Sequence, residues 1–116
     1  MEEALGTVTI HPTVLTTVAR LTSLATPGVA RVGSEWRLSM ERVLCRPGRA
    51  RGVDLSIQDN AVTIDLYVAA EPGTNLLRLG QTLQNEVSRA VQDMIGMEVA
   101  AVNVHIQDVD FPLVRG

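Results

Sequence analysis

The chain has 116 residues, a formal net charge of −3 and a single cysteine, Cys45. This length predicts one domain over residues 1–116, which can bury roughly two-thirds of its unfolded surface and so needs no disulfide. One cysteine excludes an internal disulfide framework and is typical of a reducing compartment. No apolar stretch approaches the ~18 residues that span a membrane, and the acidic start at Glu2 is unlike a signal peptide. We therefore expect a cytoplasmic domain without a membrane span.

The first quarter of the chain predicts a short strand followed by a helix. Residues 6–10 alternate between polar and apolar, which favours a strand, and Pro12 suits the first turn of a helix. Apolar residues then recur at spacings of four, three and four, which predicts a helix with one buried face made of Val14, Val18, Leu21 and Ala25. Pro27 and Gly28 end this helix, and residues 29–32 can form a further short strand.

An arginine-rich connection over residues 33–51 comes next. Six of the ten arginines lie between Arg31 and Arg51, and Trp36 and Met40 lie at helical spacing. We interpret the segment as a short amphipathic helix inside a mobile connection. A solvated connection is the simplest explanation, but an aromatic side chain among arginines also suits a protein partner or an anionic surface.

A β-hairpin is predicted over residues 53–69. Asp59 and Asn60 form a suitable two-residue turn, since both residue types tolerate positive φ. The turn joins strands 53–58 and 61–69 and sets their register. Apolar residues then face one another on a single side of the hairpin, in the pairs Val53–Leu66, Leu55–Ile64 and Ile57–Val62.

A second helix and a last strand complete the pattern. Asn75 is a plausible N-cap, and Gly96 a suitable C-terminal stop. The helix is expected to bury one stripe of apolar residues, namely Leu76, Leu79, Leu83, Val87, Ala90, Val91 and Met94. The last strand is expected over about residues 100–109.

These elements predict an α+β fold of two layers in the order β-α-(β)-β-β-α-β. Two amphipathic helices need one sheet face to cover. The apolar strand positions supply that face, which comprises Val8, Ile10, Val53, Leu55, Ile57, Val62, Ile64, Leu66, Val68, Val102, Val104 and Ile106. The opposite face is polar, and it comprises Thr7, Thr9, Asp54, Ser56, Thr63, Asp65, Tyr67, Asn103, His105 and Gln107. An open mixed or antiparallel sheet, with both helices on one face, suits this pattern better than a buried parallel sheet.

The chain carries no recognisable catalytic motif. Phosphate-binding glycine loops, the zinc-protease motif and the C-x-x-C motif are all missing from the sequence. His11 and His105 would meet only if the first and last strands were neighbours. Asp54 and Asp65 face each other in the predicted hairpin, where they could bind a cation or remain solvated. We therefore predict no catalytic residue, no metal ligand and no cofactor.

Six segments in order resemble the alkaline shock protein family, the envelope stress response family of mainly Gram-positive bacteria. The segments are residues 6–12, 27–30, 52–55, 62–68, 85–87 and 102–106. The resemblance implies a small, non-enzymatic cytoplasmic protein of cell-envelope homeostasis. It also implies that the protein self-associates and can lie at the membrane through an integral membrane partner.

We expect an interaction protein that forms homo-oligomers through its open sheet face or an exposed strand edge, and that docks on an envelope-associated partner such as a small membrane protein. The candidate surface combines the basic connection with the polar sheet face, and it comprises Arg31, Trp36, Arg37, Met40, Arg42, Arg46, Arg49, Arg51, Asp54, Asp65, Tyr67 and His105. One alternative is a nucleic-acid-binding module that uses the arginine-rich residues 31–51, although the acidic pI of about 5.3 argues against it. Another alternative is a small-molecule enzyme that uses Asp54, Asp65 and His105.

Overall fold

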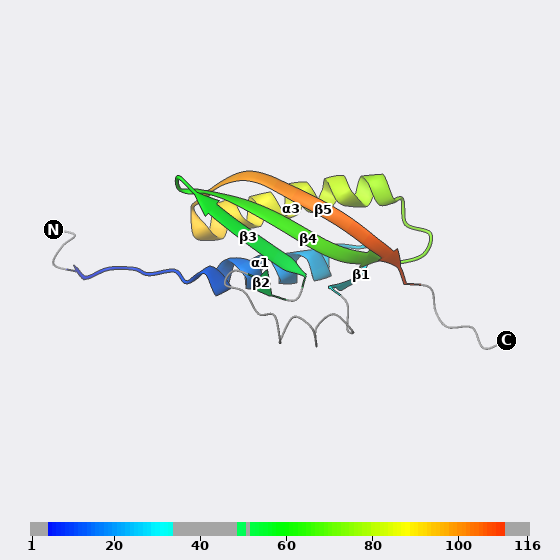
Figure 1. Cartoon of the computed structure of the whole chain (residues 1–116), viewed down its shortest axis with the longest axis horizontal. Coiled ribbons are helices and arrows are strands. Elements are labelled where there is room, and N and C mark those ends of the chain that lie inside the picture. The colour runs from blue at the N-terminus through cyan, green and yellow to red at the C-terminus, as the bar shows by residue number, and fades with distance from the viewer. Residues whose placement is uncertain (1–4, 34–48, 51, 111–116) are drawn as a thin grey trace.

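The computed structural model describes residues 5–33, 49–50 and 52–110. In this part of the chain, two helices lie together on one face of a five-stranded sheet, as Figure 1 shows. This is the expected two-layer α+β fold. In chain order the elements are α1 (Pro12–Ala25), β1 (Val29–Val32), β2 (Arg49–Ala50), β3 (Val53–Gln58), β4 (Ala61–Ala70), α3 (Leu76–Ile95) and β5 (Glu98–Val109).

Strand β4 is the centre of the sheet. Strand β5 runs parallel to it along the whole of one edge. The other edge of β4 pairs with β3 over its first six residues and with β1 near its end, both antiparallel, and β2 pairs with the far side of β3. The sheet is therefore mixed, because α3 returns the chain so that β5 enters in the same direction as β4.

The hairpin has the expected register. Val53 pairs with Leu66, and the same register continues to Ile57 opposite Val62. Asp59 and Asn60 have φ angles of 53° and 66°, as a hairpin turn with two positive φ values requires. The apolar residues of β4 on this side, from Val62 to Val68, are at most 1% exposed under the helices.

Strands β1 and β3 meet end to end beside Tyr67. The backbone N–H of Gly33 donates to the carbonyl of Tyr67 at 2.7 Å, and the N–H of Tyr67 donates to the carbonyl of Gly52 at 2.8 Å. Gly52 has a φ of +87°, and a Cβ there would lie 2.6 Å from the nitrogen of Gly33. The junction therefore needs glycine for both its conformation and its close backbone approach.

Helix α3 confirms the predicted caps and most of the predicted stripe. The side chain of Asn75 accepts a hydrogen bond from the N–H of Arg78 at 3.0 Å, and Gly96 ends the helix with a φ of 81°. Its buried residues are Leu79, Leu83, Val87 and Val91. The prediction was wrong for Leu76 and Met94, which are 39% and 68% exposed because they lie at the two ends of the helix, beyond the full cover of the sheet.

Helix α1 buries a different face from the one predicted. Val14, Leu21 and Ala25 are exposed, and only Val18 of the predicted set is buried. The buried face is made largely of small residues, and it comprises Leu15, Thr16, Val18, Ala19 and Ser23. The hydroxyl group of Ser23 donates to the carbonyl of Ala19 at 2.8 Å, so this polar side chain can lie in the core with its donor satisfied.

Residues 5–10 form no strand, which corrects the prediction for the N-terminus. The segment is exposed throughout, and Val8 is 90% exposed instead of lying in the core. Figure 1 shows it extending away from the body of the molecule before α1. Thr7 and Thr9 consequently do not lie on the polar sheet face. The alternating pattern identifies residues that suit a β-strand. A strand also needs a sheet edge to which it can hydrogen-bond, and the pattern does not show whether the same chain provides one.

The middle of the chain gives mixed outcomes. The expected short strand over residues 29–32 is confirmed as β1. Of residues 33–51, the structure describes only Gly33 and the two residues of β2. The short helix expected within this segment therefore lies outside the described residues.

Candidate functional site

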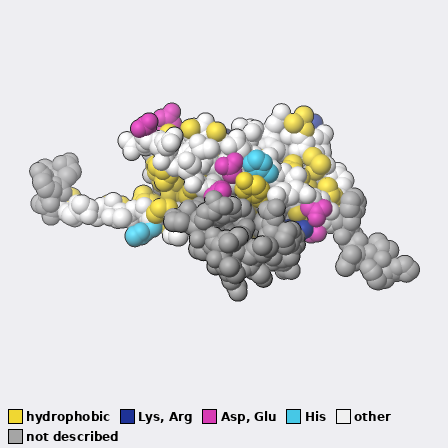
Figure 2. Space-filling model, viewed as in Figure 1, with side chains coloured by type: hydrophobic (Ala, Val, Ile, Leu, Met, Phe, Trp, Pro, Cys, Tyr) yellow, Lys and Arg dark blue, Asp and Glu magenta, His cyan; other side chains and the backbone are white. Residues whose placement is uncertain are grey.

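The sheet face away from the helices carries the polar side chains that the strand parity predicted. Asp54 pairs with Asp65 across β3 and β4, and Asp65 pairs with Asn103 across β4 and β5. The next row on β4 and β5 places Tyr67 opposite His105. Figure 2 shows the histidine and acidic side chains side by side on this face. We call Asp54, Asp65, Tyr67 and His105 the open-face cluster.

His105 is fixed from two sides within the open-face cluster. Its Nε2 lies 3.1 Å from Oδ1 of Asp65, a hydrogen bond when Nε2 carries the proton, because a carboxylate only accepts. Its ring stacks on the ring of Tyr67, with centroids 4.6 Å apart and planes 12° from parallel. The side chains of His105 and Asp65 are 45% and 30% exposed, so the pair remains accessible to solvent. Asp54 and Tyr67 also have further interactions.

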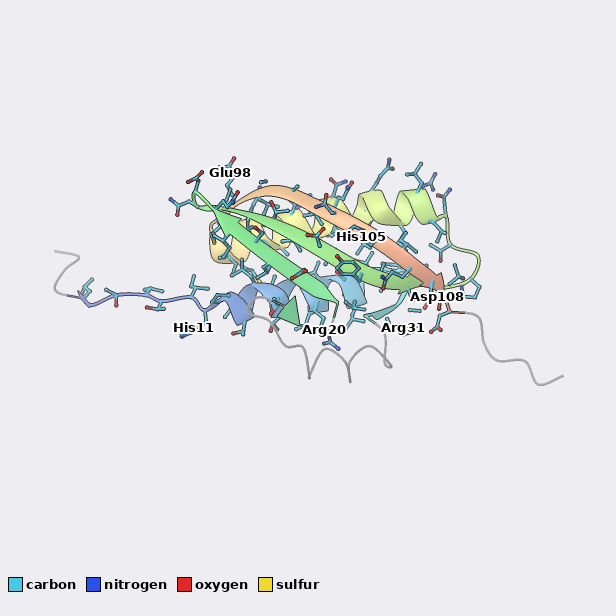
Figure 3. All side chains as sticks on the ribbon, in the orientation of Figure 1. His11, Arg20, Arg31, Glu98, His105 and Asp108 are labelled. Carbon is cyan, nitrogen blue, oxygen red and sulfur yellow. The ribbon has the colours of Figure 1, made fainter. Side chains whose placement is uncertain are left out.

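A second charged group lies at the end of the same face. Arg31 of β1 and Asp108 of β5 lie on either side of Ala69, which is 1% exposed beneath them. The guanidinium of Arg31 lies 3.6 Å from a carboxylate oxygen of Asp108 and 3.5 Å from one of Asp110, and it donates to the carbonyl of Gly33 at 2.8 Å. Figure 3 shows Arg31 and Asp108 close together at this end of the sheet. These half-exposed ion pairs position the three side chains but add little stability.

An apolar groove of about 470 Å³ lies between α3 and β5. Its lining comprises Leu76, Leu77, Gly80, Gln81, Gln84, Val104 and Ile106. Leu77 is 74% exposed, and Gly80 contributes no side chain to the lining. Sequence reasoning missed this site. Two consecutive leucines at the start of the helix were the available signal, because they lie about 100° apart around the helix and only one can face the sheet squarely.

The outer edge of β5 borders this groove. Within residues 5–33, 49–50 and 52–110, β5 pairs only with β4, so the opposite edge of this 12-residue strand has no strand partner. Gln84 of α3 donates its amide to the carbonyl of Val102 at 3.2 Å and so satisfies one backbone group of β5. The register of β5 shifts near Ala100 and Gln107, and Val102 to Ile106 form the regular stretch between these two irregularities.

The structure describes only part of the predicted surface. It brings Asp65, Tyr67 and His105 together, with Asp54 adjacent, and it places Arg31 at the end of the same face. Six of the predicted residues lie outside the described part of the chain, namely Trp36, Arg37, Met40, Arg42, Arg46 and Arg51. Arg49 belongs to β2 by its backbone, which pairs with Asp54.

No group of three or more metal-ligating side chains occurs among the described residues. His11 lies at the start of α1 and His105 in the middle of β5, well apart in Figure 3. His11 and His105 were expected to meet only if a strand before His11 lay beside the last strand. Residues 5–10 form no strand, so this condition is not met. In the part of the chain that the structure describes, neither helix is long and apolar enough to cross a membrane.

Comparison with known sequences identifies one protein family. The model of the alkaline shock protein family, described as having a cell envelope-related function, matches residues 1–111. Protein Spy1535 of Streptococcus pyogenes serotype M6 is 31% identical over 108 residues, which cover 92% of this chain and 81% of that protein. The Bacillus subtilis proteins YqhY and YloU are 22% and 24% identical, over 92% and 90% of this chain and 79% and 88% of their own.

Comparison with solved structures supports the fold. Two variants of MamM-CTD superpose with TM-scores of 0.54 and 0.52, at 12% and 11% sequence identity. The matches cover 86% and 84% of this chain, and 100% and 95% of the other chains. At this level of identity the likeness shows a shared fold and nothing about ligands or partners.

Proposed function

Because this chain belongs to the alkaline shock protein family, whose function is cell envelope-related, we propose that it is a non-enzymatic interaction protein that self-associates and docks on an envelope-associated partner. The partner we propose is a small membrane protein, which would hold the chain at the membrane from the cytoplasmic side. Docking uses the open-face cluster together with Arg31.

The observation that carries this proposal is the fixed arrangement of the open-face cluster. Asp65 and Tyr67 hold the imidazole of His105 from two sides, on adjacent strands that the helices support from behind. Side chains positioned on regular strands lose little conformational freedom on binding, which favours recognition. Tyr67 supplies a ring, and Arg31 a planar donor, the side-chain types enriched where proteins meet.

The location of the cluster supports binding over catalysis. The cluster lies on the solvent side of the sheet, whereas the apolar groove lies beside the helix layer, between α3 and β5. An Asp–His pair can move protons, but His105 and Asp65 are both open to water on this face. General acid–base catalysis draws much of its effect from a site that excludes water and positions a substrate.

The alternative of a nucleic-acid-binding module depends mainly on arginines outside the described residues. On the described face, the carboxylates of Asp54 and Asp65 would repel a phosphate backbone. The open-face cluster therefore favours a protein partner.

The test is capture from crosslinked membranes of cells that express the tagged full-length chain. The variants are His105→Ala and Tyr67→Ala, with Ser56→Ala as the matched control, since Ser56 is exposed on the same face in β3. We expect one membrane protein to be recovered with the wild-type chain and with Ser56→Ala, and about tenfold less with either cluster variant. Urea unfolding of each variant shows that the fold is retained. Equal recovery by all four chains would place docking elsewhere, and a chain that never fractionates with membranes would refute the proposal.

A further inference from the structure

We infer that residues 5–10 of one copy of this chain add as a strand to the free edge of β5 in a second copy, with Val8 and Ile10 seated in the groove between α3 and β5. This inference rests on the proposed self-association and specifies its geometry. We call residues 5–10 the N-terminal arm.

The N-terminal arm has the properties of a strand that lacks a partner. Residues 6–10 alternate, with the apolar side chains of Val8 and Ile10 at 90% and 44% exposure, and Leu5 precedes this alternation at 86% exposure. The arm pairs with no strand in the described part of the chain. Alternating segments of this composition gain stability only when an edge supplies backbone hydrogen bonds and an apolar surface covers alternate side chains.

The edge of β5 offers the missing backbone partners. The arm is six residues long and β5 has twelve, so the arm can pair with the regular stretch from Val102 to Ile106. Free edges of this length attract strands from other molecules, and many proteins cover or interrupt them. Here the hydrogen bond from Gln84 to the carbonyl of Val102 shows that one of the groups available for pairing is already engaged by a side chain, which an incoming strand would displace.

The side-chain parity of the arm matches the two faces of β5. Val104 and Ile106 point to the helix side, where they line the groove, whereas Asn103 and His105 point to the open face. In an added strand, Val8 and Ile10 share one side, so they can extend the apolar row of β5 over the exposed side chain of Leu77. Thr7 and Thr9 then join the polar face. The opposite parity would place both Val8 and Ile10 in water, so these two residues favour one arrangement.

The position of the arm favours a second copy over its own β5. The arm leads into α1, which packs beneath β1, β2 and β3 on one side of β4, whereas β5 lies on the other side of β4. Figure 1 shows the arm leaving the body and pointing away from the sheet. Each chain therefore carries one donor arm and one acceptor edge. Repeated pairing between copies gives rings or open chains, and reciprocal pairing gives a dimer.

The test measures the mass of the full chain by light scattering and sedimentation across a range of concentrations. The donor variant is Val8→Asp with Ile10→Asp, and the acceptor variant is Leu77→Asp, at a position that is 74% exposed in the single chain. The matched control is Thr7→Asp with Thr9→Asp, which adds the same charge to the arm on its polar side. We expect the dissociation constant to rise about a hundredfold in the donor variant and at least about tenfold in the acceptor variant, because a charge replaces apolar contact, and much less in the control.

Mixing the variants makes the test specific. The donor variant keeps a competent edge and the acceptor variant keeps a competent arm, so a mixture should form dimers of one of each and nothing larger. If the wild-type chain self-associates and every variant does so with the same dissociation constant, the arm exchange is overturned but self-association stands. A wild-type monomer at every concentration would overturn both. The wild-type chain could also be a monomer whose β5 amides are protected from hydrogen exchange, with that protection lost in the donor variant. This result would show that the arm binds its own chain, and it would also overturn the exchange.

Discussion

Replacement of Gly52 by alanine should destabilise the protein through the junction beside Tyr67. The new Cβ would lie 2.6 Å from the nitrogen and 2.8 Å from the Cα of Gly33, and 2.9 Å from the carbonyl oxygen of Tyr67. All three are backbone atoms, so relief requires β1 and β3 to move apart. That movement stretches the two hydrogen bonds at 2.7 and 2.8 Å that hold both strand ends to β4.

The magnitude follows from two contributions. A non-glycine residue at a φ of +87° costs about 1–2 kcal/mol. Weakening the two backbone hydrogen bonds costs about 1 kcal/mol each. We therefore expect the Gly52→Ala variant to lose about 3–4 kcal/mol of unfolding free energy. In urea this loss should lower the unfolding midpoint by more than about 1 M, measured by circular dichroism.

Gly73→Ala is the matched control for this experiment. Gly73 has a φ of +86°, nearly the same as that of Gly52, but nothing lies within 4 Å of a Cβ built there. The control should therefore lose only the conformational part, about 1–2 kcal/mol. Any effect of alanine on the unfolded chain is common to both variants and cancels in the difference. Equal destabilisation by the two substitutions would refute the steric argument and show that the junction adapts.

Three further predictions concern the stability of the fold, each read from urea unfolding at low protein concentration. Leu83→Ala should lose about 3–4 kcal/mol of unfolding free energy, since Leu83 is fully buried. Leu77→Ala, at an exposed position of the same helix, should lose less than about 1 kcal/mol, and similar losses in the two variants would contradict the assigned helix face. Asn75→Ala should lose about 1 kcal/mol through the cap on the N–H of Arg78, and retention of stability by Asn75→Ser but not by Asn75→Ala would identify the cap as the cause. Asn60 has a φ of 66°, so Asn60→Gly should leave the unfolding free energy unchanged or raise it by up to about 1 kcal/mol. Asn60→Val should lower it by about 1–2 kcal/mol, and an Asn60→Val variant as stable as the wild type would argue against the turn geometry.

The second half of the fold could be predicted because its local signals agree. The Asp59–Asn60 turn, the strand parity on either side and the caps of α3 each specify the same register and boundaries. The same parity located the open-face cluster, including the pairing of Asp54 with Asp65. The contact between Asp65 and His105 was not predictable, since it depends on β5 pairing parallel to β4.

The first half was less predictable for two physical reasons. Helix α1 packs through Ala19 and Ser23, and a search for large apolar residues overlooks a face built from small side chains and internally bonded hydroxyl groups. The N-terminal arm has the sequence of a strand, but pairing is a property of the partner edge, which no local pattern reveals. The groove between α3 and β5 was missed for a related cause, because Leu77 was not assigned to a face.

The central position of β4 also determines the order in which the fold can assemble. Its hairpin with β3 is local, but its other edge must wait until α3 and then β5 have been synthesised. During translation the apolar side of β4 and the stripe of α3 therefore lack their last neighbour until the final described strand emerges. Parallel pairing across an intervening helix closes a long loop and is slow compared with hairpin formation. The stretch of the nascent chain from Ala61 to Ile95 is consequently the one most in need of protection from aggregation before β5 arrives.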